Sequence, residues 1–321
     1  MLISSYHKLL DKIQNESCRF LAQQNLRLPQ KYVATDAFTT AKSIEMLLIS
    51  SKPCMISRFG SVELTDVCDY IGIHSTERKS IINFVKGKRL RWWWNETNAT
   101  CMLMNAGVFP KSELTRERFA QLMLDVMPQT DLLGSWQERE KYVKDLMPDT
   151  QFVKLRHIEP FWTTRPWSRQ LEGKRVLVIH PFVQTIKKQY ENRALLFKNS
   201  ETLPVFDINV MPSVQSIGGN TEFKDWFEAL QYMKNNIAKT QFDICLLGCG
   251  AYGMPLAAYI KSIGKKAIHM GGALQLLFGI RGNRWDKISA YADHLYNEHW
   301  IRPLEEDIAP QLRNVENGCY L

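Results

Sequence analysis

Short apolar runs alternate with amphipathic segments along the chain. Apolar residues recur at helical spacing in three segments, residues 1–27, 39–50 and 223–238. Three other runs are short and apolar, and each stops at a turn or polar residue: residues 54–59 before Gly60, residues 101–104 before Asn105, and residues 176–179 before His180. A polar helix is expected after the last of these, reaching Phe197. The alternation predicts an α/β fold with a mainly parallel sheet and helices on both faces.

The clearest strand–turn–helix–strand unit spans residues 242–272. An apolar run over 242–247 leads into GCGAYG, Pro255 suits a first helical turn, and Gly264 suits a helix end. Residues 266–270 predict the next strand, which ends at Gly271-Gly272. Such a turn can bind phosphate through its free backbone amides. A dinucleotide-binding fold also has an acidic residue at the end of the next strand, which binds the ribose hydroxyls. Here that strand reads AIHMGG, with no Asp or Glu, which argues against a dinucleotide site. A nucleotide or sugar-nucleotide diphosphate site and a tight turn without ligand both remain open.

Two further predicted strands are followed by polar residues that could bind a ligand or take part in catalysis. In ISRFGSVE, Arg58 suits a phosphate or carboxylate, and Glu63 enters a helix near the expected ligand edge. Glu63 is equally explained as a carboxylate favoured by the helix dipole. In HPFVQTIKKQYENR, His180 closes a strand, and Thr185, Gln189 and Arg193 share one helix face that could hold a diphosphate or a sugar. A structural histidine and a solvated polar face explain the same residues.

These segments, in this order, resemble a family of bacterial glycosyltransferases with the GT-D fold, first known as a domain of unknown function. The resemblance runs from about Pro53 to the C-terminus and is densest over 175–320, including RVLVIHPF, GCGAYG, FGIRGNRW and NEHWIRP. It implies one glycosyltransferase domain over residues 1–321, with a helical segment at 1–50 and a Rossmann-like core at 53–321. It also implies transfer of a hexosyl unit, such as glucosyl or galactofuranosyl, from a UDP-sugar to a saccharide hydroxyl. Such enzymes assemble capsule, O-antigen or glycoprotein glycans.

The resemblance also implies roles for particular residues. The residues expected to bind the donor are Arg58, Gly60, His180, Gln189, Arg193, Gly248, Gly250, Tyr252, Gly253, Gly271 and Gly272. Independently of the resemblance, the position of Asn105 and Trp136 near expected strand ends makes them candidates for acceptor contacts, and structural roles explain them equally. The family motif usually reads Asp-x-Glu and is taken to hold a divalent metal, whereas this chain has Ser61-Val62-Glu63. One carboxylate is a poor site for Mg²⁺ or Mn²⁺, so we expect metal-independent transfer with no required cofactor.

The remaining carboxylate is then available as a base. Glu63 is expected to take the proton of the acceptor hydroxyl in an inverting displacement, and Glu159 and Asp131 are rival bases. Two other classes of function stay open. One is a nucleotide-binding scaffold without transfer activity, and the other is an NAD-dependent oxidoreductase that uses the same glycine turn.

Composition and charge indicate which partners and which cellular location to expect. Lys and Arg number 41 against 33 Asp and Glu, a net charge of +8 that suits anionic partners. The seven cysteines form no CxxC pair, and the N-terminal residues lack the apolar core of a signal peptide, so a cytoplasmic protein is expected. Residues 78–94 join basic side chains to Trp92-Trp93-Trp94, which suits the inner membrane face, a lipid-linked acceptor or a sugar-stacking subsite. A solvated basic helix with core tryptophans is the alternative, and no nucleic-acid motif occurs.

Overall fold

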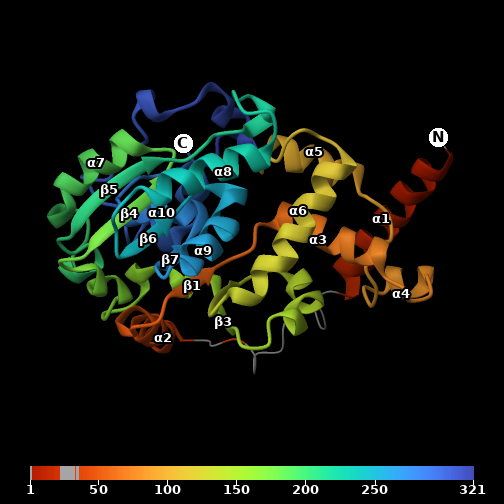
Figure 1. Cartoon of the computed structure of the whole chain (residues 1–321), viewed down its shortest axis with the longest axis horizontal. Helices are drawn as coiled ribbons and strands as arrows, with labels where there is room; N and C mark the ends of the chain where they lie inside the picture. Colours follow the sequence, from red (N-terminus) through yellow and green to blue (C-terminus); the bar gives the residue numbers. More distant parts are fainter. Residues whose placement is uncertain (1, 22–32, 34–35) are drawn as a thin grey trace.

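Seven strands form one sheet in the order β3-β2-β1-β7-β6-β4-β5, and every pair of neighbours is parallel (Figure 1). The computed structural model describes residues 2–21, 33 and 36–321. The strands are β1 (Cys54–Ser57), β2 (Leu132–Ser135), β3 (Gln151–Lys154), β4 (Arg175–His180), β5 (Asp207–Pro212), β6 (Ile244–Leu247) and β7 (Lys266–His269). This arrangement confirms the predicted α/β, Rossmann-like class.

Two apolar cores lie on opposite faces of the sheet, because successive strand residues point to opposite sides. Met55 of β1 joins one core, and its neighbour Ile56 joins the other. Helices α3 (Ser61–His74), α6 (Glu113–Val126), α8 (Trp226–Ala238) and α9 (Gly253–Ser262) supply the first core. Helices α2 (Ala37–Ile49), α7 (Val183–Glu191) and α10 (Leu274–Leu277) supply the second. Central strands covered on both faces explain why their sequences are continuously apolar.

Local signals fix several helix ends. The Asp36 side chain accepts hydrogen bonds from the Phe38 and Thr39 amides at 2.9 and 2.8 Å, which caps α2. Pro255 lies in the first turn of α9, as expected. After α9 the chain reverses at Gly264 with φ +78°, a left-handed conformation that glycine adopts without strain. The predicted unit around GCGAYG is therefore present as β6, a short 3-10 turn, α9 and β7.

Two local predictions are wrong. Residues 101–104 belong to α5 (Glu96–Met104) instead of a strand. The missed signal is Asn95, whose side chain accepts from the Asn98 amide at 2.7 Å and caps this helix. The polar helix predicted to reach Phe197 ends as α7 at Glu191, and a separate 3-10 turn covers Arg193–Leu195.

The amino-terminal end of the chain packs apart from the sheet. Helix α1 (Leu2–Leu21) confirms most of the helix predicted over 1–27, whose residues 1 and 22–27 lie outside the described residues. It packs on α4 (Ile81–Val85), and both stand at the far side of the molecule from α7 (Figure 1). Short helices α11 (Asn283–Asp286) and α12 (Ser289–Ala292) follow α10. Within the described ranges, every helix is too short or too polar to cross a bilayer.

Candidate active site

A cavity of about 510 Å³ opens at the carboxyl edge of the sheet. Residues that end or follow all seven strands line it, so segments distant in sequence meet there. This is the edge at which open parallel sheets bind ligands. The predicted site residues that line it are Arg58, Gly60, Glu63, Asn105, Trp136, Glu159, His180, Gly248, Gly250, Tyr252, Gly271 and Gly272.

The loop from β1 to α3 presents a cation and a carboxylate. Gly60 is the N-cap of α3, and Glu63 lies in the first turn of that helix. A Cβ atom on Gly60 would lie 2.0 Å from Glu63 Oε2, so only glycine leaves room for this carboxylate position. Burial lowers the pKa of Arg58, and the charge of Glu63 opposes that shift, because an opposite charge favours the guanidinium form. Arg58 also approaches Gly271, whose Cβ position lies 3.4 Å from Arg58 Cδ.

The loop after β2 places an aromatic ring beside Arg58. Trp136 is 48% exposed, and its Nε1 donates to the Phe59 carbonyl at 2.9 Å. The Arg58 guanidinium lies 5.1 Å from the centre of the Trp136 ring. Buried Glu140 holds this loop by accepting from the Trp136 and Gln137 amides, each at 3.1 Å. A fixed, half-exposed indole at a cavity wall offers an apolar face for stacking.

Glu159 follows β3 and is nearly enclosed. Its Oε2 accepts from Trp162 Nε1 at 2.6 Å and from the Tyr291 hydroxyl at 3.0 Å. Burial raises the pKa of Glu159 to about 7, although both hydrogen bonds oppose the shift. A carboxyl that titrates near neutral pH suits general acid or base chemistry.

His180 ends β4 as a neutral imidazole. Its Nδ1 accepts from the Phe182 amide at 3.0 Å, and burial lowers its pKa to about 3. The proton therefore resides on Nε2, and the ring can donate a hydrogen bond without carrying charge. Gly248 permits this ring position, because a Cβ there would lie 2.5 Å from His180 Cδ2.

The glycine turn after β6 opens toward the cavity. Gly250 has φ +56°, and no atom comes within 4 Å of its Cβ position. Tyr252 is buried, stacks on Trp226 with ring centres 4.7 Å apart, and shares a hydrogen bond of 2.6 Å with Ser216. Gly272 lies against Tyr320, whose Cε1 would be 2.3 Å from a Cβ atom. Gly250 thus leaves space for a ligand to approach the backbone, and Gly272 allows the Tyr320 ring to pack directly against the backbone at the cavity.

Three cavity residues from the C-terminal part of the chain were missed by sequence reasoning. Gln275, Arg284 and Tyr320 line the cavity beside Trp285. Gln275 Nε2 donates to the carbonyls of Arg281 and Tyr320 at 3.0 and 3.2 Å, and its buried Oε1 accepts no hydrogen bond within the described chain. The Arg284 guanidinium lies 4.7 Å from the Tyr320 ring centre. These residues follow no strand directly, so neither spacing nor strand ends indicated them.

Four predicted site residues lie outside the cavity lining: Asp131, Gln189, Arg193 and Gly253. Asp131 precedes β2, at the opposite edge of the sheet, where it pairs with Lys261 at 2.7 Å. Gln189 is buried and donates to the carbonyls of Gly279 and His299 at 3.0 and 3.1 Å. Arg193 stacks on Tyr190 beyond the end of α7, and Gly253 packs on the His269 ring.

Thr185, predicted to share a ligand-binding helix face with Gln189 and Arg193, is bound within the chain at the start of α7. The amides of Gln184 and Thr185 donate to the Asp307 carboxylate at 3.1 and 2.7 Å. The Thr185 hydroxyl donates to the same carboxylate at 2.6 Å. An α-helix begins with amides that have no partner within the helix, and here the Asp307 carboxylate binds two of them, so they are not available to a ligand.

The side chains near Glu63 do not fit a divalent metal. Among the residues that the structure describes, no three His, Cys, Asp or Glu side chains gather as metal ligands. The charge of Arg58 acts on Glu63 instead, and a guanidinium supplies no ligand atom. Asn105, the C-cap of α5, also lines the cavity, but its side chain is a neutral amide and cannot replace the missing second carboxylate of a metal site.

The family assignment agrees with this geometry. A family model described as a GT-D fold-like domain matches residues 36–277, which include every strand of the sheet. The chain belongs to this GT-D-like family, whose fold is of the glycosyltransferase type. Searches of curated proteins and of solved structures returned no match.

Proposed function

We propose that this protein transfers a hexosyl unit from a UDP-sugar to a saccharide hydroxyl during assembly of a bacterial surface polysaccharide or glycoprotein glycan. One observation carries the proposal. Arg58, Glu63, His180, Gly250 and the Gly271-Gly272 turn line a single cavity, although they come from four separate strand ends. Membership of the GT-D-like family supports the same reaction class.

Cations and open backbone near the cavity suit a diphosphate. Arg58 and Arg284 both line it, and Gly250 leaves open space beside the start of α9. Arginine binds phosphate oxygens through two parallel N–H donors, and glycine allows the backbone to come close. The neutral His180 ring adds a donor without adding charge. We propose that these groups stabilise the leaving UDP without a divalent metal.

The proposed step is a direct displacement at the anomeric carbon. The acceptor oxygen forms a bond to that carbon while the bond from the carbon to the diphosphate oxygen breaks, and UDP leaves with the electron pair. The acceptor proton passes to Glu63, which reaches the cavity from the first turn of α3. This single displacement inverts the anomeric configuration. Trp136 offers its exposed ring face to the acceptor sugar.

Glu159 is a second candidate base, because burial holds its pKa at about 7. The pH dependence of kcat/KM separates the two carboxylates, since a base must be ionised to act. If Glu159 is the base, the rate falls as pH drops below about 7, and Glu159→Gln removes the activity. If Glu63 is the base, Glu63→Gln removes the activity, and Glu159→Gln keeps most of it.

Ligand binding and transfer test the proposal together. Thermal denaturation is measured with UDP, UDP-hexoses, a GDP-sugar and NADH, because a ligand that binds the folded state raises Tm. UDP-hexoses are then incubated with saccharide acceptors, with EDTA and with added Mn²⁺. We expect stabilisation by UDP and transfer that survives EDTA. Stabilisation by NADH alone supports the oxidoreductase, UDP binding without transfer supports the scaffold, and activity restored only by Mn²⁺ contradicts the metal-free step.

A further inference from the structure

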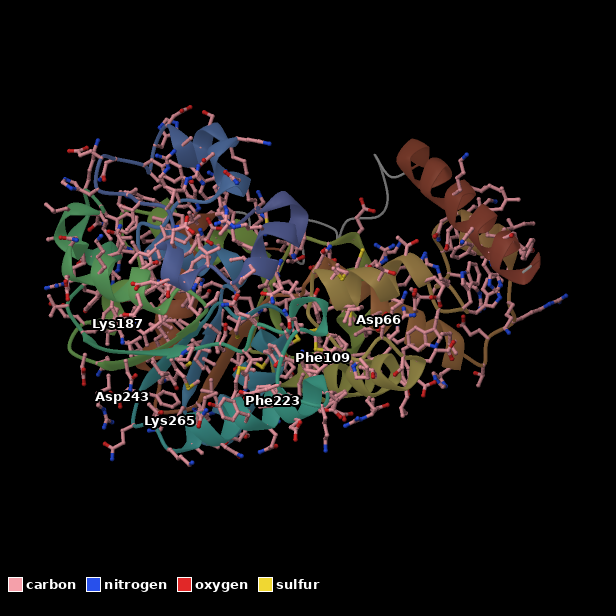
Figure 2. The ribbon with its side chains drawn as sticks, turned by 90° about the horizontal axis from the view of Figure 1, so that it is seen from above. Asp66, Phe109, Lys187, Phe223, Asp243 and Lys265 are labelled. Atoms are coloured by element: carbon pink, nitrogen blue, oxygen red, sulfur yellow. The ribbon has the colours of Figure 1, made fainter. Side chains whose placement is uncertain are left out.

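Helix α1 and residues 77–94 form a projecting unit, here called the end unit. Figures 1 and 2 both show α1 at one end of the long axis, and Figure 2 places Lys187 toward the other end. Leu10 of α1 packs with Phe84 and Trp93 in a small apolar cluster of its own. The end unit therefore has its own small core, and its outer surface does not pack against the sheet or the two main cores.

Polar contacts fix the end unit to the body. Arg91 is buried and binds Asp11 of α1 at 2.8 Å and Asp69 of α3 at 2.6 Å. His7 stacks on Trp93 with ring centres 4.3 Å apart. The tryptophans predicted to meet a membrane or a sugar make contacts within the chain: Trp93 is buried, partly buried Trp92 packs edge-on against it at 5.0 Å, and the Arg116 guanidinium lies 4.2 Å from the centre of the Trp94 ring. Other apolar and basic side chains therefore form the exposed surface of the end unit.

Apolar side chains remain exposed on both helices of the unit. Tyr6, Leu9 and Ile13 of α1 are 47%, 54% and 38% exposed, and their spacing of three and four residues puts them on one helix face. On α4, Ile81 and Ile82 are 45% and 66% exposed. Exposed aliphatic side chains gathered at one end of a protein indicate an interaction surface.

The same segments of the chain also carry exposed basic side chains. Those that are exposed are Lys8, Lys12, Arg78, Lys79, Lys86 and Lys88. Two carboxylates of the end unit are paired with arginines of the same unit, Asp11 with Arg91 and Glu77 with Arg89, each at 2.8 Å. The surface therefore carries a local positive charge among its aliphatic groups.

We propose that the end unit docks on an anionic phospholipid bilayer. The apolar side chains of α1 and α4 enter the boundary between headgroups and acyl chains, and the lysines and arginines contact lipid phosphates. A protein partner fits less well, because lysine is depleted in protein–protein interfaces. The proposal does not depend on the proposed transfer reaction, since it concerns a different part of the molecule.

Vesicle co-sedimentation with the full chain tests this docking. We expect binding to vesicles of phosphatidylcholine mixed with phosphatidylglycerol, and much weaker binding to phosphatidylcholine alone. The double variant Leu9→Glu/Ile82→Glu should reduce the partition coefficient at least tenfold, and Lys86→Glu/Lys88→Glu should reduce it about fivefold or more for each charge lost. Thermal denaturation of each variant checks that it folds, as expected for exposed positions.

Matched controls carry the same changes elsewhere. Met46→Glu/Ile49→Glu alters two exposed apolar residues of α2, and Lys187→Glu/Lys188→Glu alters two exposed lysines of α7. Both control proteins should bind like the unchanged chain. Three results would each overturn the proposal: no binding to anionic vesicles, equal binding to both lipid compositions, or losses in the controls as large as in the end-unit variants.

Discussion

The substitution Gly60→Ala tests how the first turn of α3 positions Glu63. Gly60 has φ −76° and ψ 148°, which alanine adopts without strain, so the backbone should tolerate the change. The added Cβ would lie 2.0 Å from Glu63 Oε2, whereas an ordinary contact begins at 3.4 Å. The carboxylate must therefore move by about 1.4 Å, because it is the flexible partner.

A shift of this size should matter for catalysis much more than for stability. Misplacing a reacting group by about 1 Å can cost roughly 100-fold in rate, so we expect kcat/KM to fall about 100-fold. The free energy of unfolding should change by about 1 kcal/mol or less, since the N-cap position loses no side-chain hydrogen bond. Initial rates of UDP release with a saccharide acceptor, and urea denaturation, give the two quantities.

A double-mutant cycle shows whether the effect passes through Glu63. If Gly60→Ala acts by displacing the carboxylate, then Gly60→Ala/Glu63→Gln should be no slower than Glu63→Gln alone. Independent losses that multiply in the double variant would refute this reasoning. So would a Gly60→Ala enzyme that keeps full activity.

Three more predictions concern other walls of the cavity. Burial raises the pKa of Glu159 from 4.5 to about 7, so stability should fall as pH rises through this interval. In Glu159→Gln that fall, on the order of 3 kcal/mol, should vanish, which urea denaturation at about pH 5 and about pH 8 would reveal. Trp136→Ala should raise KM for the acceptor by tenfold or so while the affinity for UDP, measured calorimetrically, stays unchanged. Tyr252→Phe should lower the free energy of unfolding by about 1 kcal/mol, because it removes the buried hydrogen bond to Ser216; an unchanged Tm would contradict this.

Local sequence signals were sufficient for most of the sheet. The apolar runs over 54–59, 176–179 and 242–247 coincide with the positions of β1, β4 and β6, because central parallel strands are buried on both faces and need apolar residues throughout. The glycine turn and α9 were predictable for the same local reason, since Pro255 and Gly264 act through backbone geometry. The strand predicted over 101–104 is part of helix α5, because a short apolar stretch is compatible with a buried helix as well as with a strand.

Only the tertiary structure decided which polar residues share the cavity. Glu63 and Glu159 both follow strands, and the parallel sheet brings their ends to one edge. Asp131 looked equivalent in sequence, but it precedes its strand, so the same parallel geometry carries it to the far edge. Gln189 was predicted to hold a diphosphate, yet the C-terminal segment packs on α7 and occupies its amide with two carbonyls. Residue type and spacing thus determined the layers of this protein, whereas long-range packing determined the site, because a side chain's partners depend on segments that no local pattern encodes.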